Sequence, residues 1–286
     1  MHTSVVVYRF IVHPIYGFIE QVFPGGNFDE GDESFRVTAI RETFEETGLL
    51  LVKGSHASRS DRRALQGVDQ DALDRARQSI LLGQTTFCKF LTDVKLTPAV
   101  DELLPFTEWV TPVRVPRYSL SRCITYTYIE EWFRRRFHAR FYITFLQDTS
   151  LFGFSHGAKQ DFIPTPDGGQ EVISTRFIHP SEALRAHRTK EMMFMPPQYY
   201  LISALAEILS GDRNTEDQRV RVRRLAGGAF GGMVIHPRQS KLGDGRVLLV
   251  YEGDELVNGP AGARHRAIMK PGSGEVGPSD RVARVG

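Results

Sequence analysis

Residues 24–33 read Pro-Gly-Gly-Asn-Phe-Asp-Glu-Gly-Asp-Glu, and residues 41–49 read Arg-Glu-Thr-Phe-Glu-Glu-Thr-Gly-Leu. The proline and the two glycines predict a turn after a short strand at 21–23, and the polar residues that follow predict a loop. From Ser34 onward the apolar residues recur at helical spacing, and Gly48 is typical of a helix end. The sequence therefore predicts a strand, a glycine turn, a polar loop and then a helix.

Three glutamates of this predicted helix share one face. Glu42, Glu45 and Glu46 are related as i, i+3 and i+4, which places their Cβ atoms within about 5–6 Å of each other. Like charges at this spacing repel unless cations neutralise them, and carboxylate oxygens favour Mg²⁺ or Mn²⁺. Arg41 lies at i, i+4 to Glu45 and can hold the local geometry without replacing the metal. A bare pattern of this kind is usually a solvated acidic face, but the glycine turn before it and the buried run after it favour a metal site.

The remainder of the chain predicts an α/β fold with a helical insertion. Residues 4–12 predict a strand ahead of the glycine turn, and residues 49–52 predict a buried strand after the helix. Residues 69–94 are strongly helix-forming with an apolar stripe, and we interpret about 53–107 as an inserted helical segment. Further strands are expected at 109–112, 141–146 and 171–178, and further helices at 180–186 and 196–209.

The composition shifts to Arg and Gly beyond Gly211, so we divide the chain into a main domain, 1–211, and a C-terminal extension, 212–286. Two short β patterns occur in the extension, and the apolar one at 247–251 needs a packing partner. About 40 ordered residues without disulfides or metal rarely sustain a core of their own. We therefore expect this strand to dock on the main domain, and we expect the Gly/Pro-rich end from Pro271 to be disordered.

Composition and charge exclude several classes of protein. With 41% hydrophobic and 24% charged residues in 286, the chain is typical of a globular protein, and no apolar run is long enough to span a membrane. A net charge of +2 provides no overall field for nucleic acid or a membrane surface, so neither is expected as a partner. Two cysteines and no signal-peptide pattern predict an intracellular protein of the cytoplasm, with the peroxisome or the mitochondrion as alternatives. The oligomeric state stays open.

The glycine turn and the carboxylate helix together resemble the Nudix hydrolases. Their signature is G-x5-E-x7-R-E-U-x-E-E-x-G-U, where U is a bulky aliphatic residue. The positions that match in type and mutual spacing are Glu33, Arg41, Glu42, Glu45, Glu46, Gly48 and Leu49. Six residues rather than five separate Gly26 from Glu33, and Thr43 stands at the first aliphatic position. The longer loop costs little, and neither departure touches the carboxylates.

The resemblance extends over about residues 20–210 to one branch of the family. This branch holds the long-insert eukaryotic members, among them fungal proteins and the mammalian peroxisomal coenzyme A diphosphatases, and it implies an α/β/α sandwich with a mixed sheet. Residues 118–133 separate two stretches that the branch places nearly adjacent, which a translated intron would explain, and the first 20 residues match poorly. The similar segments are 22–26, 39–51, 109–112, 136–141, 180–184 and 196–198.

The resemblance implies a metal-dependent hydrolase that cleaves the diphosphate of a small nucleotide-type substrate, with coenzyme A and its acyl esters as candidates. Glu45 and Glu46 are then the main ligands of Mg²⁺ or Mn²⁺, and Glu42 is a ligand or the general base, although the base varies within the family and can lie outside this helix. Glu33 and the carbonyl of Gly26 are accessory ligands. Arg41 completes the catalytic set.

Two questions stay open at the level of sequence. Arg136 and Arg140 belong to a basic run near a strand, and they are candidates for binding the substrate phosphates, with a solvated face as the alternative. The alternative function is a Nudix-fold module that binds a nucleotide or a protein without hydrolysing it. Such a module has no reason to keep all three helix carboxylates, so the sequence favours the enzyme.

Overall fold

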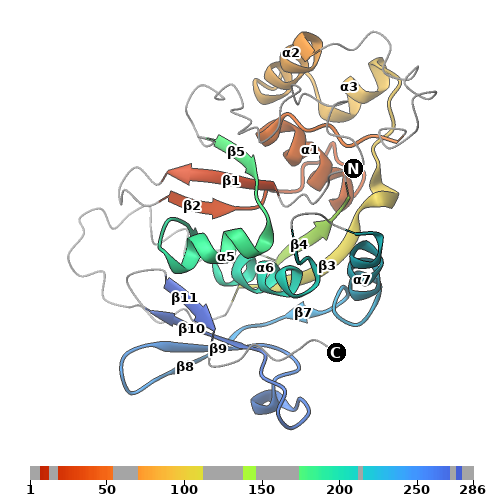
Figure 1. The fold of residues 1–286 in the computed structure, drawn as a ribbon. Helices are drawn as coiled ribbons and strands as arrows, with labels where there is room; N and C mark the ends of the chain where they lie inside the picture. The colour runs from red at the N-terminus through yellow and green to blue at the C-terminus, as the bar shows by residue number, and fades with distance from the viewer. Residues whose placement is uncertain are drawn as a thin grey trace.

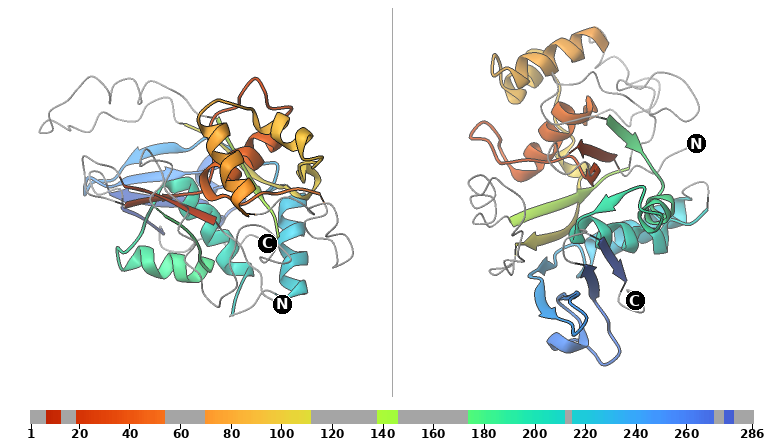
Figure 2. Two further views of the ribbon diagram at one scale, coloured as in Figure 1. Left: turned by 90° about the horizontal axis from the view of Figure 1, so that it is seen from above. Right: turned by 90° about the vertical axis from the view of Figure 1, so that its left-hand side faces the viewer.

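The computed structural model describes residues 7–12, 19–53, 70–111, 138–145, 174–211, 215–270 and 275–278. Residues 118–133 and Arg136, which the sequence analysis singled out, lie outside these ranges. The described elements form three sheets with helices packed around them (Figure 1). Helices α2 and α3 lie at one end of the molecule and the C-terminal sheet lies at the other, as Figure 2 also shows.

The first sheet is mixed, and one of its strands ends at Val22, just before the glycine turn. Its strand order is β5-β1-β2-β6, in which β2 runs antiparallel to β1 and parallel to β6. The strands expected at 4–12, 21–23 and 171–178 are confirmed with shorter or shifted bounds. These bounds are β1 Val7–Val12, β2 Ile19–Val22, β5 Ser174–Phe177 and β6 Met193–Phe194.

The second sheet has the order β4-β3-β7 and takes its last strand from the C-terminal extension. It comprises β3 Leu104–Val110, β4 His138–Ile143 and β7 Val234–Ile235. Strand β3 pairs antiparallel with β4, and the register shifts where Thr107 takes a positive φ of 73°. The N–H of Thr107 donates to the carbonyl of Gly231 at 3.2 Å, which ties the extension to this irregularity.

Helix α1, Phe35–Thr47, confirms the predicted carboxylate helix and packs on a core shared with α2 and α3. The helical segment expected at 69–94 is confirmed. It is two helices, α2 Gln70–Leu81 and α3 Phe87–Asp93, because Gly83 takes a left-handed φ of 68° and Thr86 starts a new helix by capping the N–H of Lys89. A short 3-10 helix, η2 Val100–Glu102, leads into β3.

Residues 49–52 are buried as expected, but the predicted strand is wrong. They form a single bridge, from Val52 to Pro98, rather than a ladder. Two hydrogen bonds flank this bridge: the N–H of Lys53 donates to the carbonyl of Thr97 at 2.7 Å, and the N–H of Ala99 donates to the carbonyl of Leu51 at 3.1 Å. An apolar run therefore indicated burial here without indicating sheet pairing.

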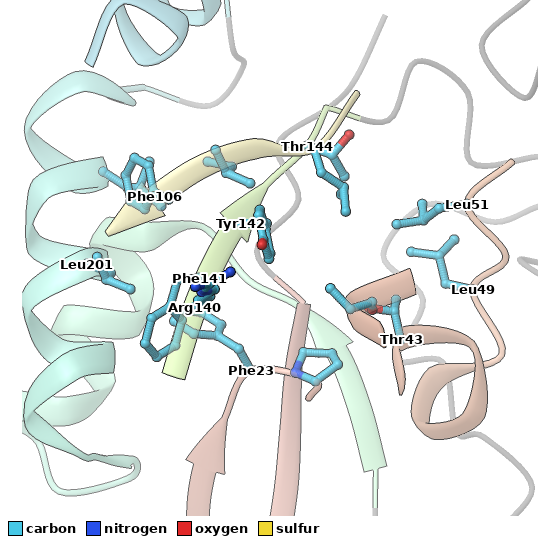
Figure 3. A pocket seen from close by; sticks show the side chains of 15 residues that line it. Phe23, Thr43, Leu49, Leu51, Phe106, Arg140, Phe141, Tyr142, Thr144 and Leu201 are labelled. Atoms are coloured by element: carbon cyan, nitrogen blue, oxygen red, sulfur yellow. The ribbon is translucent and has the colours of Figure 1, made fainter. Parts of the chain in front are cut away.

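Two helices, α5 and α6, form a layer on the side of β4 that faces away from α1. Helices α5 and α6 pack against each other, and β4 lies between α6 and α1 (Figure 3). The helices predicted at 180–186 and 196–209 are confirmed as α5 Pro180–Arg188 and α6 Pro196–Ile208. Helix α7, Glu216–Gly227, was not predicted, although Thr215 and Gln218 form the capping box that marks its start. None of the described helices is both long and apolar enough to cross a membrane.

The third sheet belongs to the extension and has the order β11-β10-β9-β8. Val247, Leu249 and Tyr251 pack in the same core cluster as Trp109 and Leu201, which confirms the docking predicted for 247–251. The boundary at residue 211 stays a prediction. The bounds are β8 Arg238–Lys241, β9 Val247–Val250, β10 Arg266–Lys270 and β11 Glu275–Pro278, with the 3-10 helix η4 Glu255–Val257 between β9 and β10.

The expectation of disorder from Pro271 is wrong for residues 275–278. This segment pairs with β10, and it buries Val276 to 2% exposure in the common core. The carbonyl of Val276 also contacts the buried ring of His187 on α5. Sheet pairing, the burial of Val276 and the contact with His187 together hold this segment in place, although its composition is rich in glycine and proline.

A buried ion pair holds the turn between β9 and β10. Asp254, fully buried, accepts hydrogen bonds from Nε and Nη2 of Arg266, both at 2.7 Å, and from the N–H of Leu256 at 2.8 Å. Burial acts to raise the pKa of Asp254, but these donors outweigh it and hold the pKa below its usual value. A carboxyl group with a lowered pKa adds stability above its unfolded-state pKa, near ~3.9, and this stability is lost as the pH falls through the folded-state pKa.

Asp254→Asn is expected to lower the free energy of unfolding by about 3 kcal/mol at neutral pH, because it leaves the Arg266 guanidinium without its buried counter-charge. The difference from wild type should shrink below about pH 4. Urea unfolding across a pH series measures it. Asp244→Asn is the matched control, because Asp244 and its partner Arg246 are exposed and should contribute no measurable stability. A difference that is the same at every pH would contradict the assignment.

Candidate active site

Helix α1 is fixed at both ends and along its buried side. The hydroxyl of Ser34 accepts from the N–H of Val37 at 3.3 Å, and Gly48 closes the helix in a left-handed conformation with φ of 73°. Phe44, fully buried, stacks on the ring of Phe90 with centroids 5.8 Å apart. A helix held in this way presents its glutamates at defined positions.

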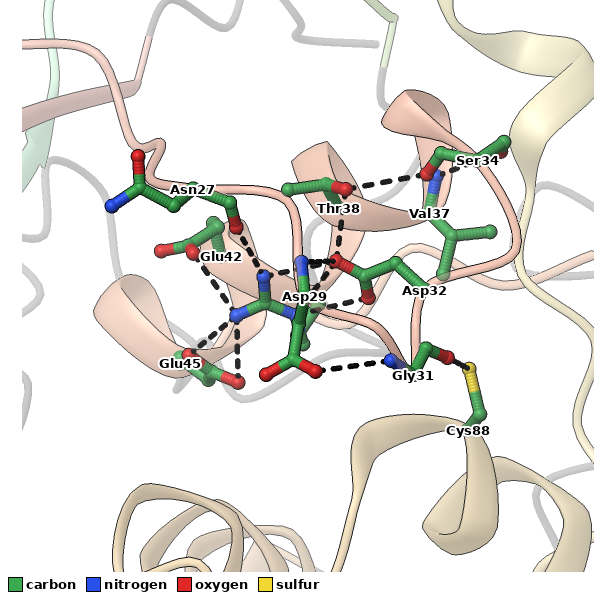
Figure 4. Close-up of polar contacts among 11 residues, drawn as sticks. Asn27, Asp29, Gly31, Asp32, Ser34, Val37, Thr38, Glu42, Glu45 and Cys88 are labelled. Atoms are coloured by element: carbon green, nitrogen blue, oxygen red, sulfur yellow. Dashed lines mark hydrogen bonds and ion pairs between the residues drawn. The ribbon is translucent and has the colours of Figure 1, made fainter.

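Arg41 gathers two of the glutamates of α1. Its Nη1 lies 2.9 Å from Oε1 of Glu42 and 3.1 Å from Oε2 of Glu45 (Figure 4). Burial acts to lower the pKa of Arg41, but the hydrogen bond to Asp32 and the charges of Glu45 and Glu42 raise it above its usual value. The guanidinium is therefore a permanent cation at the centre of the acidic face.

Asp32 holds the opposite side of that guanidinium. This carboxylate is 6% exposed, and it accepts from Nε of Arg41 at 3.0 Å, from Nη2 at 3.0 Å and from the hydroxyl of Thr38 at 2.8 Å. Nη2 also donates to the carbonyl of Asn27 at 2.9 Å. Burial acts to raise the pKa of Asp32, but Arg41, the N–H of Asp29 and Thr38 outweigh it, so the pKa is lowered. The polar loop and the helix are thus joined through one ion pair.

The glycine turn lies directly against the carboxylates of Glu42 and Glu46. The N–H of Gly25 donates to Oε2 of Glu46 at 3.2 Å. The carboxylate of Glu42 lies in the space that a Cβ atom at Gly26 would occupy, so any larger residue here would have to displace this side chain. The structure therefore brings Gly26, Glu42 and Glu46 together, as the sequence predicted, while the role of the Gly26 carbonyl as a ligand stays a prediction.

Asp32 rather than Glu33 is the acidic residue of the loop that contacts Arg41. Glu33 is exposed and immediately precedes the Ser34 cap, whereas Asp32 contacts Arg41. Counted backward from Arg41 the Nudix signature leads to Glu33, but counted forward from Gly26 it leads to Asp32. That forward count is the signal that could have found Asp32. The accessory metal role of Glu33 stays a prediction.

Arg140 lies beside the start of α1, and Arg136 is outside the described residues. The Cζ atom of Arg140 lies 4.2 Å from the ring centroid of Phe35, and its Nε is 3.3 Å from Oε1 of Glu108. Phe35 and Glu42 are seven residues apart, two helical turns, so this guanidinium is on the same side of α1 as the carboxylates. Its predicted contact with substrate phosphate is compatible with this position and stays a prediction.

The acidic face fits a hard divalent cation in its donor chemistry. Among the described residues no three His, Cys, Asp or Glu side chains are grouped as a metal site, and Arg41 lies between Glu42 and Glu45. Burial raises the pKa of Glu45 above its usual value, and the charge of Glu42 adds to this rise against the attraction of Arg41. A cation in addition to Arg41 would stabilise the charged form of carboxylates that lie this close together. Glu42, Glu45 and Glu46 are the residues that would hold Mg²⁺ or Mn²⁺.

Arg77 of the inserted helix α2 contacts the C-terminal end of helix α1. Its Nε donates to the carbonyl of Glu45 at 2.6 Å and its Nη2 donates to the carbonyl of Glu46 at 3.0 Å. The last carbonyls of a helix have no partner within it, and a cation there also stabilises the helix dipole. The insertion therefore supports the backbone of Glu45 and Glu46, the two predicted main metal ligands. Sequence reasoning missed Arg77 because no local pattern links positions 31 and 32 residues apart.

Arg77→Met is expected to lower the free energy of unfolding by about 3 kcal/mol, because two charge-assisted hydrogen bonds to buried carbonyls are lost. Arg75→Met is the matched control on the same helix, since Arg75 is exposed. Denaturant unfolding of both variants measures the difference. Equal stability of the two variants would show that Arg77 does not support α1.

The mixed sheet, the helix layers and the carboxylate helix against a glycine turn define a Nudix domain. Residues 18–205 match the family model described as the NUDT19 Nudix domain, and the chain belongs to this family. The α/β Nudix fold expected from the sequence is thereby confirmed.

Relatives of known name share this domain. The chain is 28% identical over 183 residues to the acyl-coenzyme A diphosphatase NUDT19 of Xenopus laevis, covering 63% of this chain and 41% of that protein. It is 25% identical over 181 residues to the human acyl-coenzyme A diphosphatase NUDT19, with 63% and 40% covered. For the putative nudix hydrolase 7 of Caenorhabditis elegans the identity is 23% over 196 residues, with 67% and 52% covered. The chain thus spans about half the length of these relatives or less. No solved structure matches it.

Proposed function

We propose that the protein is a metal-dependent Nudix diphosphatase that hydrolyses coenzyme A or an acyl-coenzyme A. The observation that carries this proposal is the acidic face of α1, where three glutamates are organised by Arg41 and by the glycine turn. The names of the relatives support coenzyme A esters as the substrate class.

The reaction adds one water molecule across the bond between the two phosphates. The hydroxyl group joins the attacked phosphorus, and the leaving phosphate takes up the proton. With coenzyme A the products are an adenosine bisphosphate and phosphopantetheine. When bound, Mg²⁺ or Mn²⁺ supplies charge neutralisation of the diphosphate and lowers the pKa of a coordinated water.

The residues of this chain supply binding and orientation. Glu45 and Glu46 hold the cation, and Glu42 is a further ligand or the base that accepts a proton from the attacking water. Arg41 fixes the rotamers of Glu42 and Glu45. The ion pair with Asp32 holds the Arg41 guanidinium in position between these carboxylates and the polar loop. Arg140 binds a substrate phosphate in this proposal, and its position beside Phe35 at the start of α1 supports that role.

The second candidate function, a module that binds without hydrolysis, has less support. Such a module needs recognition of its ligand but no cation site, and it would tolerate loss of any one carboxylate. Here the loop, the turn and the helix all make contacts that maintain the acidic face. The arrangement therefore favours hydrolysis.

Turnover of a substrate panel tests the proposal. The purified protein is incubated with coenzyme A, acyl-coenzyme A, ADP-ribose and diadenosine polyphosphates, with and without Mg²⁺ or Mn²⁺, and both product halves are separated by chromatography. We expect metal-dependent cleavage of coenzyme A or its esters. A preference of about tenfold or more for ADP-ribose or a diadenosine polyphosphate would overturn the coenzyme A assignment. Tight binding without turnover across the panel would establish the binding module instead.

A further inference from the structure

An apolar cavity lies beneath the catalytic helix. Its volume is about 140 Å³, it is partly open to solvent, and its lining residues come from α1, β4 and α6 among other segments (Figure 3). Leu201 and Leu205 of α6 form the far wall, Thr43 of α1 forms the near wall, and Phe23 and Pro24 lie at one side. Thr43 is the position where the Nudix signature has a bulky aliphatic residue, so the smaller side chain leaves space there.

The cavity lies beside the acidic face. Ala39 and Thr43 line it, and Glu42 lies between them on the same helix. Phe23 and Pro24 lead directly into the turn whose glycines contact Glu46 and Glu42. A group in the cavity would therefore be close to a diphosphate bound at these carboxylates.

The chemistry of the walls selects an apolar occupant. Most lining side chains are hydrocarbon, and the hydroxyl of Thr43 already donates to the carbonyl of Ala39 at 2.7 Å. Arg140 supplies a charge in the lining, and its Nε lies 3.3 Å from Oε1 of Glu108. A sugar placed here would lose its hydrogen bonds to water without sufficient replacement. The volume is comparable to that of engineered cavities of about 150 Å³ that bind benzene, so a group of about six carbons fits.

We propose that this cavity binds the branched, dimethyl-bearing pantoyl group of coenzyme A, and this inference rests on the proposed function. In coenzyme A one phosphate carries the polar ribose of adenosine, and the other carries the pantoyl group directly. The acyl chain is attached at the far end of the pantetheine arm, too distant for a cavity adjoining the diphosphate site. The dimethyl-bearing carbon of the pantoyl group, two bonds from the phosphate oxygen, is the apolar part of the substrate that is near enough, and the pantoyl hydroxyl and carbonyl follow it toward the open side of the cavity. ADP-ribose and diadenosine polyphosphates lack this group, so the cavity favours coenzyme A over them.

Leu205→Phe tests the inference by filling the cavity from the α6 wall. The matched control is Ile208→Phe, because Ile208 lies on the same helix, packs against the same core and does not line the cavity. Thr43→Leu fills the cavity from the opposite wall and replaces Leu205→Phe if that variant does not fold. Melting temperatures establish which variants are folded. Calorimetry with Mg²⁺ present then measures the binding of phosphopantetheine and of the adenosine bisphosphate product separately.

In the folded cavity variant, phosphopantetheine should bind about tenfold more weakly or worse, and the adenosine bisphosphate should bind as to wild type. Ile208→Phe should change neither affinity. Unchanged binding of phosphopantetheine would overturn the inference, as would a loss confined to the adenosine bisphosphate or shared equally by both products. Turnover of coenzyme A by the wild-type protein is the separate test of the proposed function. If the wild type cleaves coenzyme A while the cavity variants bind phosphopantetheine normally, only the inference fails; if it cleaves none, the function fails first.

Discussion

Glu46→Gln is expected to reduce the rate of coenzyme A hydrolysis by roughly 10²–10³-fold at saturating Mg²⁺, with a melting temperature near that of the wild type. The substitution removes one negative charge but keeps the shape of the side chain. The amide oxygen can still accept the N–H of Gly25, which lies 3.2 Å from the carboxylate in the wild type. Glu46 is 8% exposed, and a bound cation would offset the cost of keeping its charge at this buried position.

Two measurements separate the metal role of Glu46 from a structural role. Steady-state kinetics across a Mg²⁺ titration give the rate at saturation, and direct Mn²⁺ binding gives the affinity without turnover. Glu30→Gln is the control, because this exposed glutamate of the polar loop loses the same charge and should change the rate by about twofold at most. A near-normal rate of Glu46→Gln at saturating Mg²⁺ would remove Glu46 from the set of metal ligands.

The parts of the fold that depend on local signals were predictable from the sequence. Ser34 and Gly48 bound α1 because an N-cap hydroxyl and a left-handed C-terminal residue act within one turn of the helix. The shared face of Glu42, Glu45 and Glu46 follows from helical geometry alone. The break between α2 and α3 also has a local cause at Gly83, but a strong helical stripe on both sides concealed it.

The parts that depend on distant contacts were not predictable. Arg77 reaches the carbonyls of Glu45 and Glu46 from another helix, and β11 is ordered by pairing with β10 and by the burial of Val276. An apolar run such as 49–52 indicates burial equally well for a strand and for an extended segment with one bridge. In each case the deciding partner lies far away in the sequence.

The loop of the Nudix signature shows where a motif count becomes ambiguous. One extra residue between Gly26 and Glu33 allows two alignments, each with an acidic residue at the key position. Sequence spacing alone cannot choose between Asp32 and Glu33. The hydrogen bonds show that Asp32 is the residue in contact with Arg41. Asp32 is buried against the guanidinium, whereas Glu33 is exposed to solvent.

Asp32→Asn is therefore expected to lower the rate of coenzyme A hydrolysis by about a hundredfold, and Glu33→Gln by no more than a few fold. Without the charge of Asp32, Arg41 pairs more strongly with Glu42 and Glu45 and competes with the cation for them. The affinity for Mn²⁺ should fall together with the rate, a change that a general loss of stability would not produce in the folded protein.

Breaking a buried ion pair also destabilises the fold, by about 3–5 kcal/mol, so the rates must be compared well below the melting temperature of Asp32→Asn. The double variant Asp32→Asn, Arg41→Met removes both charges and should recover part of this stability without recovering activity, because Glu42 and Glu45 then lose the group that orients them. If Glu33→Gln instead loses more activity and more Mn²⁺ affinity than Asp32→Asn, the functional acid is Glu33, the residue that the signature reaches when counted backward from Arg41. The contact between Asp32 and Arg41 would then serve the structure of the loop alone.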